Sequence, residues 1–197
     1  MRFLLIIFFV FLNFENNFSE LFLSLTSSIS NVGFSLNSSP NNLSFVFLIL
    51  VIIGGSFFST SSGIRFLKIY SLFKYSINEI LSYSRPKNIY INKHLFSKDS
   101  FKLDEIYKYF LSVIVFIISL LILTFLLTLS GIDFESSFKL SILTIMNTVN
   151  SSMFGLGDFS FYDLHFMTKY YLIFFMIVGR LELLTLLIIC KKFLFKN

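Results

Sequence analysis

The chain has 197 residues, of which 55% are hydrophobic and 29 are phenylalanine, and its mean hydropathy is +0.81. Only 14% of its residues are charged, against roughly 25% in an ordinary soluble domain. This composition excludes a soluble globular domain and predicts an integral membrane protein. The net charge of +5 does not require nucleic acid as a partner, because basic residues also mark the cytoplasmic loops of membrane proteins.

The first hydrophobic run, residues 3–12, is about half as long as a membrane-spanning helix. We expect a short or oblique transmembrane helix here; a signal peptide is the alternative, although the small-residue cleavage site is missing. The next segment, Phe18–Phe34, is half apolar. It predicts a helix of about twelve residues, about 18 Å long, followed by a short irregular tail. Such a helix can enter a membrane but cannot cross it.

The third segment, Leu43–Ile64, is long enough to cross a membrane but is interrupted by small residues. Gly54 and Gly55 remove two side chains in succession, and the Ser and Thr hydroxyls that follow can bond to nearby backbone. Irregular backbone at membrane depth is tolerated only where protein or water satisfies its polar groups. We therefore expect a broken helix beside a water-lined path; the alternative is a small-residue face for close helix packing.

Charge placement predicts the orientation in the membrane. Nine Lys or Arg residues lie between Arg65 and Lys108, whereas residues 14–42 contain none. By the positive-inside rule this basic loop is cytoplasmic, and the basic residues near both ends of the chain place both termini there too. Phe110–Leu129 then crosses the membrane, since it is twenty residues long and carries no charge.

A second half-apolar segment, Phe138–Phe154, matches the segment that begins at Phe18 when the chain is shifted by 120 residues. The matched pairs are Phe18 with Phe138, Leu23 with Leu143, Ser24 with Thr144, Ser28 with Thr148, Ile29 with Val149 and Phe34 with Phe154. This internal repeat predicts two copies of one unit.

The last segment, Tyr170–Cys190, has the length of a span but carries Arg180 on the order of 15 Å from its end. An ionisable residue at this depth is a functional candidate, and on a cation path Arg180 forms an electrostatic barrier. The alternative is a structural role, in which the guanidinium binds backbone carbonyls of the broken helix.

Together these elements predict an all-α integral membrane fold of two helix, pore loop, helix repeats. The predicted units are residues 1–64, a basic cytoplasmic linker at 65–108, and residues 109–197. A short helix that ends inside the membrane directs its partial negative end, and the carbonyls beyond it, at the centre, which suits a cation. Gly33 permits the positive φ that turns carbonyls inward; the alternative for Gly33 is an ordinary outside turn.

Four motifs resemble one known family. They are SSISNVGFS, IGGSFFSTSSGIR, NTVNSSMFGLG and GRLE, and they are similar to motifs of the TrkH-type subunit of the Trk/Ktr/HKT potassium-transporter superfamily. The resemblance implies that the chain is the third and fourth repeats, the C-terminal half, of a four-repeat, pseudo-fourfold cation-channel-like fold. The implied function is potassium uptake across the cytoplasmic (inner) membrane. It implies K⁺ as the transported ion, no catalytic residue and no bound cofactor.

The resemblance also implies roles for individual residues. Backbone carbonyls of the pore-loop tails form the ion filter: Asn31, Val32, Gly33, Ser151, Ser152 and Met153. A flexible loop below the filter forms the gate: Gly54, Gly55, Ser56, Ser59, Thr60, Ser61, Ser62 and Gly63. Arg180 faces this gate as the pore barrier. Met153 stands where the family has a filter glycine, so we expect a long side chain near the pore axis.

The chain holds two repeats where the family has four, so either first-half repeats or a second copy must complete the ring. The other implied partners are the lipid bilayer and a nucleotide-binding regulatory subunit of TrkA type at the basic loop; no nucleic acid is expected. An alternative is a truncated or decayed fragment, or an assembly subunit, without transport activity. An acyltransferase is a further alternative, because His94–Asp99 has the H-x4-D spacing, but no downstream phosphate-binding element follows.

Overall fold

The computed structural model describes most of the chain between residues 18 and 180. The described residues are 18–34, 41–54, 66–84, 103–150, 152–156, 159–162, 164–180 and 192. Within them the protein is helical, with six α-helices, one 3₁₀-helix and no strand. In chain order these are α2 (Phe18–Ile29), α3 (Asn41–Gly54), α4 (Phe66–Ser84), α5 (Leu103–Leu129), α6 (Phe134–Met146), η1 (Ser152–Phe154) and α7 (Phe166–Arg180).

Helix α5 confirms the continuous helix predicted over residues 110–129. It is 27 residues long, and its segment Glu105–Leu129 is the one helix in the described part of the chain that is long and apolar enough to cross a membrane. One face of α5 enters the core through Leu123 and Leu127, which are both fully buried. The opposite face is also apolar, because Leu121 and Phe125 remain 59% and 62% exposed. A helix that is apolar on both faces is expected in contact with lipid.

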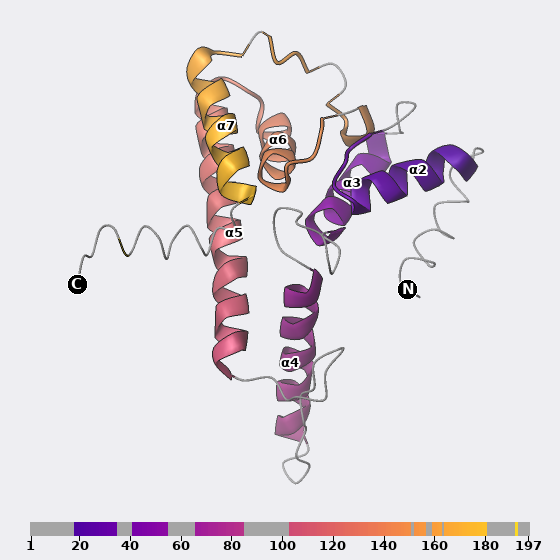
Figure 1. Ribbon diagram of the computed structural model, residues 1–197, viewed down its shortest axis with the longest axis vertical. Helices are drawn as coiled ribbons and strands as arrows, with labels where there is room; N and C mark the ends of the chain where they lie inside the picture. Colours follow the sequence, from indigo (N-terminus) through magenta and orange to yellow (C-terminus); the bar gives the residue numbers. More distant parts are fainter. Residues whose placement is uncertain are drawn as a thin grey trace.

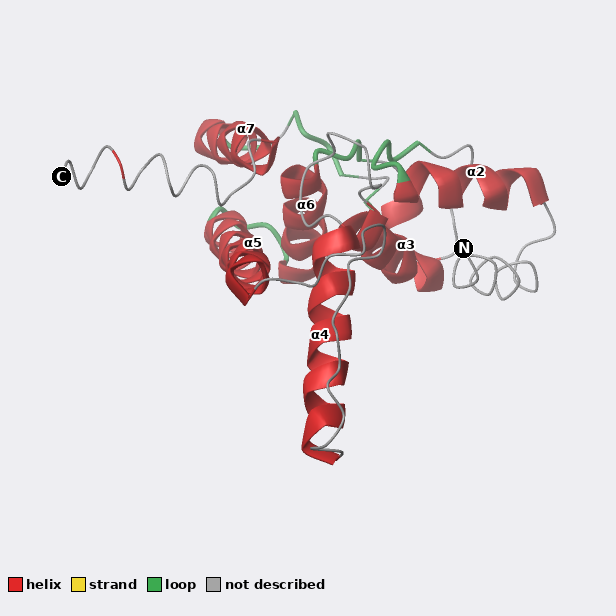
Figure 2. Cartoon of the chain, turned by 60° about the horizontal axis from the view of Figure 1, so that its bottom comes forward, coloured by secondary structure: helices red, strands yellow, loops and turns green. Residues whose placement is uncertain are grey.

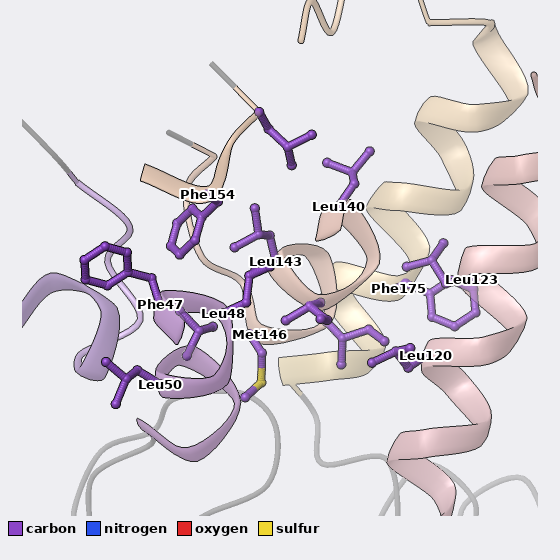
Figure 3. Packing of buried hydrophobic residues seen from close by; sticks show 14 of the residues in the cluster. Phe47, Leu48, Leu50, Leu120, Leu123, Leu140, Leu143, Met146, Phe154 and Phe175 are labelled. Atoms are coloured by element: carbon purple, nitrogen blue, oxygen red, sulfur yellow. The ribbon is translucent and has the colours of Figure 1, made fainter. Parts of the chain in front are cut away.

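Helix α6 lies at the centre of the described structure, where it contacts α5, α7 and α3 (Figure 1). All residues of α6 from Leu140 to Met146 are buried. Figure 3 shows Phe47 and Leu48 of α3 facing Phe154 and Met146. The two predicted copies therefore share one hydrophobic core, and α3 of the first copy packs against α6 and η1 of the second.

Helix α4 was not foreseen in the sequence, where residues 65–108 were interpreted only as a basic loop. The helix runs for 19 residues and projects away from the other helices (Figure 2). It contacts α5, and the Lys68 Nζ donates a hydrogen bond to the Ser112 Oγ at 3.3 Å. The linker thus begins with a helix that packs beside α5, while its cytoplasmic location stays a prediction.

Several predicted features lie outside the described residues. These are the short hydrophobic run at 3–12, residues 55–63 of the predicted gate, the His94–Asp99 motif, and the C-terminal part of the last span at 181–190. The described part of α3 ends at Gly54, the first residue of the predicted gate.

Candidate functional site

The two short helices end in the same way. After α2, Asn31 adopts a left-handed conformation with φ 57°, its N–H donates to the Ser28 carbonyl at 3.3 Å, and the Val32 N–H donates to the Ser27 carbonyl at 3.0 Å. This pair of bonds is a Schellman-type helix end, which favours Gly or Asn at the left-handed position.

Helix α6 ends with the same pair of bonds. Asn147 has φ 54° and donates to the Thr144 carbonyl at 3.1 Å, while Thr148 donates to the Leu143 carbonyl at 2.9 Å. Asn147 lies 116 residues after Asn31, so the two helix ends correspond at this shift. The sequence shift of 120 residues is therefore wrong by about one helical turn at the point where each tail begins.

The tails that follow these two helices lie side by side. The Val149 N–H donates a hydrogen bond to the Val32 carbonyl at 3.1 Å. Next to it, Gly33 is buried and has φ 84°. A side-chain carbon on Gly33 would overlap the Val149 carbonyl oxygen and lie 2.8 Å from the Thr148 Cγ2. Only glycine allows this close approach, and the contact joins the two copies through their backbones.

The predicted filter residues of the second copy lie in a different setting from those of the first copy. Met153 lies in η1, is fully buried and belongs to the hydrophobic core. By contrast, Val32 and Val149 are 52% and 65% exposed. The Met153 side chain therefore packs in the hydrophobic core, and its position relative to the pore axis stays a prediction. Ser152 is the first residue of η1, and Ser151 lies outside the described residues.

A cavity of about 260 Å³ lies beside the second tail. Leu140 and Leu143 of α6, Leu172 and Met176 of α7, and residues 147–150 line it, together with Phe161 and Thr144. The Thr148 Oγ1 and the Asn150 Oδ1 are buried without a hydrogen-bond partner among the described atoms. Buried oxygens without a partner are costly unless water or a cation reaches them.

The side-chain amides of Asn31 and Asn147 reach the helix that follows each tail. The Asn31 amide faces the carbonyl oxygens of Val51 and Ser28, so we assign its nitrogen to this position, from which it donates at 3.1 and 3.2 Å. The Asn147 Nδ2 donates to the Met176 carbonyl at 3.0 Å. Val51 and Met176 therefore occupy corresponding places in α3 and α7.

Glycine also brings α6 and α7 together. A side-chain carbon on Gly179 would overlap the Ile145 carbonyl, so α7 crosses α6 at backbone contact. Arg180 follows at the end of α7 and is exposed in the described structure. The predicted barrier residue thus lies one residue beyond this crossing, and what it faces in the gate segment lies outside the described residues.

Of the predicted site residues, the structure brings together Asn31, Val32 and Gly33 with the start of the second tail. The residues that meet them, Thr148 and Val149, were not predicted as site residues. A signal for them existed in the sequence: each tail follows an Asn, and Asn is favoured in the left-handed conformation that ends a helix. Within the described residues, no group of three or more His, Cys, Asp or Glu side chains is placed to hold a metal ion.

Paired short helices with irregular tails, beside one long helix that is apolar on both faces, are typical of helical membrane transport proteins. A sequence model of the TrkH family, described as a cation transport protein, matches residues 9–195. The chain therefore belongs to the TrkH family. This is a family of cation transport proteins and not of enzymes.

The fold is similar to that of a solved relative, the potassium transporter TrkH from Vibrio parahaemolyticus, with a TM-score of 0.76 and 22% sequence identity. The match covers 94% of this chain and 41% of that transporter, so the chain spans less than half of the relative's length. No match was found among curated protein sequences.

Proposed function

We propose that the chain takes part in potassium uptake as the C-terminal half of a TrkH-type transporter, with an ion filter built from backbone carbonyls. The observation that carries this proposal is the contact between the two tails, where Val149 donates to Val32 and Gly33 packs against the Val149 carbonyl. Irregular backbone from two short helices converges at one place, and carbonyl oxygens at such a place can replace the hydration shell of an alkali ion.

The first tail keeps its proposed filter residues, Asn31, Val32 and Gly33, with one refinement. One lone pair of the Val32 carbonyl is used by Val149. Among the described backbone groups, no donor binds the carbonyls of Asn31 and Gly33. We therefore assign the carbonyl oxygens of Asn31 and Gly33 as the main ion-facing oxygens of this copy.

In the second copy, we extend the proposed filter, Ser151, Ser152 and Met153, to the tail that begins at Thr148. The burial of Met153 in the core argues against its side chain as part of the path. The unpartnered oxygens of Thr148 and Asn150 beside the cavity support the extension. Both oxygens are hard ligands of the kind that bind alkali ions or the water around them.

Below the filter, we propose the loop from Gly54 to Gly63 as the gate and Arg180 as the barrier. Both assignments come from the family resemblance. The described structure supports them in one respect, because both segments begin close to the tails. Gly54 ends α3 three residues after Val51, and Arg180 ends α7 four residues after Met176. Each segment therefore begins less than two helical turns from the point where an Asn side chain joins it to a tail.

We further propose that the first-half repeats, or a second copy, cover one face of α7. Leu48 and Val51 of α3 are 1% and 0% exposed, because α3 packs on α6 and η1. Their counterparts in α7, Ile173 and Met176, are 54% and 39% exposed. In the first copy, the short helix of the next repeat, α6, covers this face of α3. The corresponding face of α7 therefore needs a short helix from another set of repeats.

The proposed location is the cytoplasmic membrane, with several crossings, both termini in the cytoplasm and the bilayer around α5. The basic linker then offers a surface for anionic lipid or for a nucleotide-binding regulatory subunit of TrkA type. The alternative function is an inactive fragment or an assembly subunit. The growth test described next distinguishes this alternative from the proposed function.

The test is potassium-dependent growth of a bacterium that lacks its own potassium uptake systems. The chain is expressed alone and together with a protein that carries the first two repeats of a TrkH-type transporter. Rescue that requires both proteins supports the proposal, and rescue by the chain alone supports assembly from two copies. No rescue, despite confirmed insertion of both proteins into the membrane, supports the inactive fragment instead.

A further inference from the structure

We propose that Asn31 and Asn147 are positioning residues that link each ion-binding tail to the helix leading to the gate or to the barrier. Their side chains, and not only the backbone carbonyls of the tails, would then transmit a change at the filter to α3 and α7. This inference rests on the proposed function for the roles of the tails. The link itself is a matter of contacts between described residues.

In the first copy, the link joins the end of α2 to the last turn of α3. Asn31 is 8% exposed and ends α2 in the left-handed conformation. Its amide donates to the carbonyl of Val51, which is fully buried and lies three residues before Gly54. The same amide also donates to Ser28, one turn back in α2. One buried side chain thus holds the two helices at a fixed distance.

In the second copy, an independent contact of the same kind joins α6 to α7. The Asn147 Nδ2 donates to the Met176 carbonyl at 3.0 Å. Met176 lies three residues before Gly179, whose missing side chain lets α7 approach the Ile145 carbonyl. The hydrogen bond from the Asn147 side chain and the close contact at Gly179 therefore both hold α7 against α6 at the same crossing.

Asparagine suits these two places because it meets two requirements at once. Its side chain tolerates a positive φ better than most residues, and its amide supplies two N–H donors. Glycine would meet only the first requirement. Aspartate also tolerates a positive φ. In its ionised form, however, it only accepts hydrogen bonds, so it cannot bond to a carbonyl oxygen, which is also an acceptor. Substitution by glycine therefore removes the link while it leaves the helix end free to form.

The test is hydrogen–deuterium exchange of the full chain in detergent, first in sodium chloride. The variants are Asn31→Gly and Asn147→Gly, with Asn31→Asp as a second way to remove the donor and Ser30→Ala as an exposed neighbouring control. Asn31→Gly should speed exchange in residues 48–54 of α3 but not in α7, and Asn147→Gly should do the reverse. Faster exchange confined to the tails, at 31–34 or 148–150, would mean that each Asn only ends its own helix. This result would overturn the proposed link.

A second arm compares exchange in potassium chloride and sodium chloride at equal ionic strength. Potassium should slow exchange in the tails and in the last turns of α3 and α7 of the wild type. In Asn31→Gly, potassium should still protect the tail but no longer α3. Equal protection of α3 in this variant would overturn the coupling. A wild type that does not respond to potassium would count against the proposed function, while the sodium arm would still decide whether the links exist.

Discussion

The backbone N–H of Val149 donates to the carbonyl of Val32 at 3.1 Å, across 117 residues of chain. This bond joins the irregular tails of two short helices that end with the same hydrogen-bond pattern. A tail that leaves a helix inside a membrane needs partners for its polar groups. Here each tail supplies part of what the other needs, and Gly33 provides the space for that approach.

Gly33→Ala should disrupt the contact between the tails. The added carbon would overlap the Val149 carbonyl, and alanine resists the φ of 84° that Gly33 adopts. Backbone strain at this positive φ costs about 1–2 kcal/mol and the overlap about 1–3 kcal/mol more, so thermal unfolding in detergent should show a clearly lower midpoint.

The control for Gly33→Ala is Gly131→Ala. Gly131 has φ 90°, but among the described residues no heavy atom beyond its chain neighbours lies within 4 Å of the added carbon. This variant should lose only the stability that the backbone strain costs, about 1–2 kcal/mol. Equal losses for the two variants would show that the contact between the tails adds nothing to stability.

Gly179→Ala should separate α6 from α7. In an isolated helix the change from glycine to alanine is favourable by roughly 1 kcal/mol, but here the new carbon would overlap the Ile145 carbonyl. Overpacking against backbone costs about 1–3 kcal/mol, so we expect net destabilisation and faster hydrogen exchange in the last turn of α6. A variant that is more stable than the wild type would contradict the close crossing.

Met153→Gly distinguishes a core position from a pore position. Met153 is fully buried in the hydrophobic core, so its truncation should leave a cavity and lower the free energy of unfolding by about 2–5 kcal/mol. If Met153 instead replaced a filter glycine and blocked the path, the same change would raise ion uptake without a loss of stability. Thermal unfolding and uptake measured on one preparation separate the two results.

The ion pair between Glu135 and Lys139 near the start of α6 should make a small contribution to stability that depends on pH. The Lys139 Nζ lies 2.6 Å from the Glu135 Oε1, and this hydrogen bond and the lysine charge lower the pKa of the Glu135 carboxyl. Because the folded-state pKa is lowered, the contribution is present above the ordinary glutamate pKa and is lost as the pH falls through the lowered value.

Glu135→Gln should therefore melt slightly below the wild type at neutral pH, and the two proteins should converge in acid. Glu135 is exposed, so the difference at neutral pH should also shrink in high salt. A difference in melting temperature that persists unchanged in acid would mean that the carboxylate charge is not its cause.

Hydrophobicity and charge were enough to predict the long apolar helix and the presence of two short helices, although α6 begins at Phe134 and not at the predicted Phe138. Phe110–Leu129 could be predicted because twenty uncharged residues have few alternatives to a helix in a membrane. The short helix α2 begins at Phe18, as the half-apolar pattern indicated. In contrast, the basic residues around α4 indicate only topology; the signal for this helix is that apolar residues such as Ile69, Phe73 and Ile77 recur at helical spacing.

The register of the second tail could not be predicted from matching residue types. Phe34 and Phe154 match in sequence, yet Phe34 is 57% exposed and Phe154 is fully buried. The helix end is set by where the backbone turns left-handed, at Asn31 and Asn147. The contact between Val32 and Val149 is a long-range backbone bond, and nothing in the identity of either valine signals it.

The central claim is that the joined tails form a potassium path, and cation uptake into proteoliposomes tests it most directly. The wild-type chain, Gly33→Ala and Gly131→Ala are each reconstituted with a protein that carries the first two repeats. We predict that potassium inhibits tracer cation uptake more strongly than sodium does. Gly131→Ala should retain this uptake, and Gly33→Ala should abolish it. Undiminished uptake by a correctly inserted Gly33→Ala variant would contradict the claim.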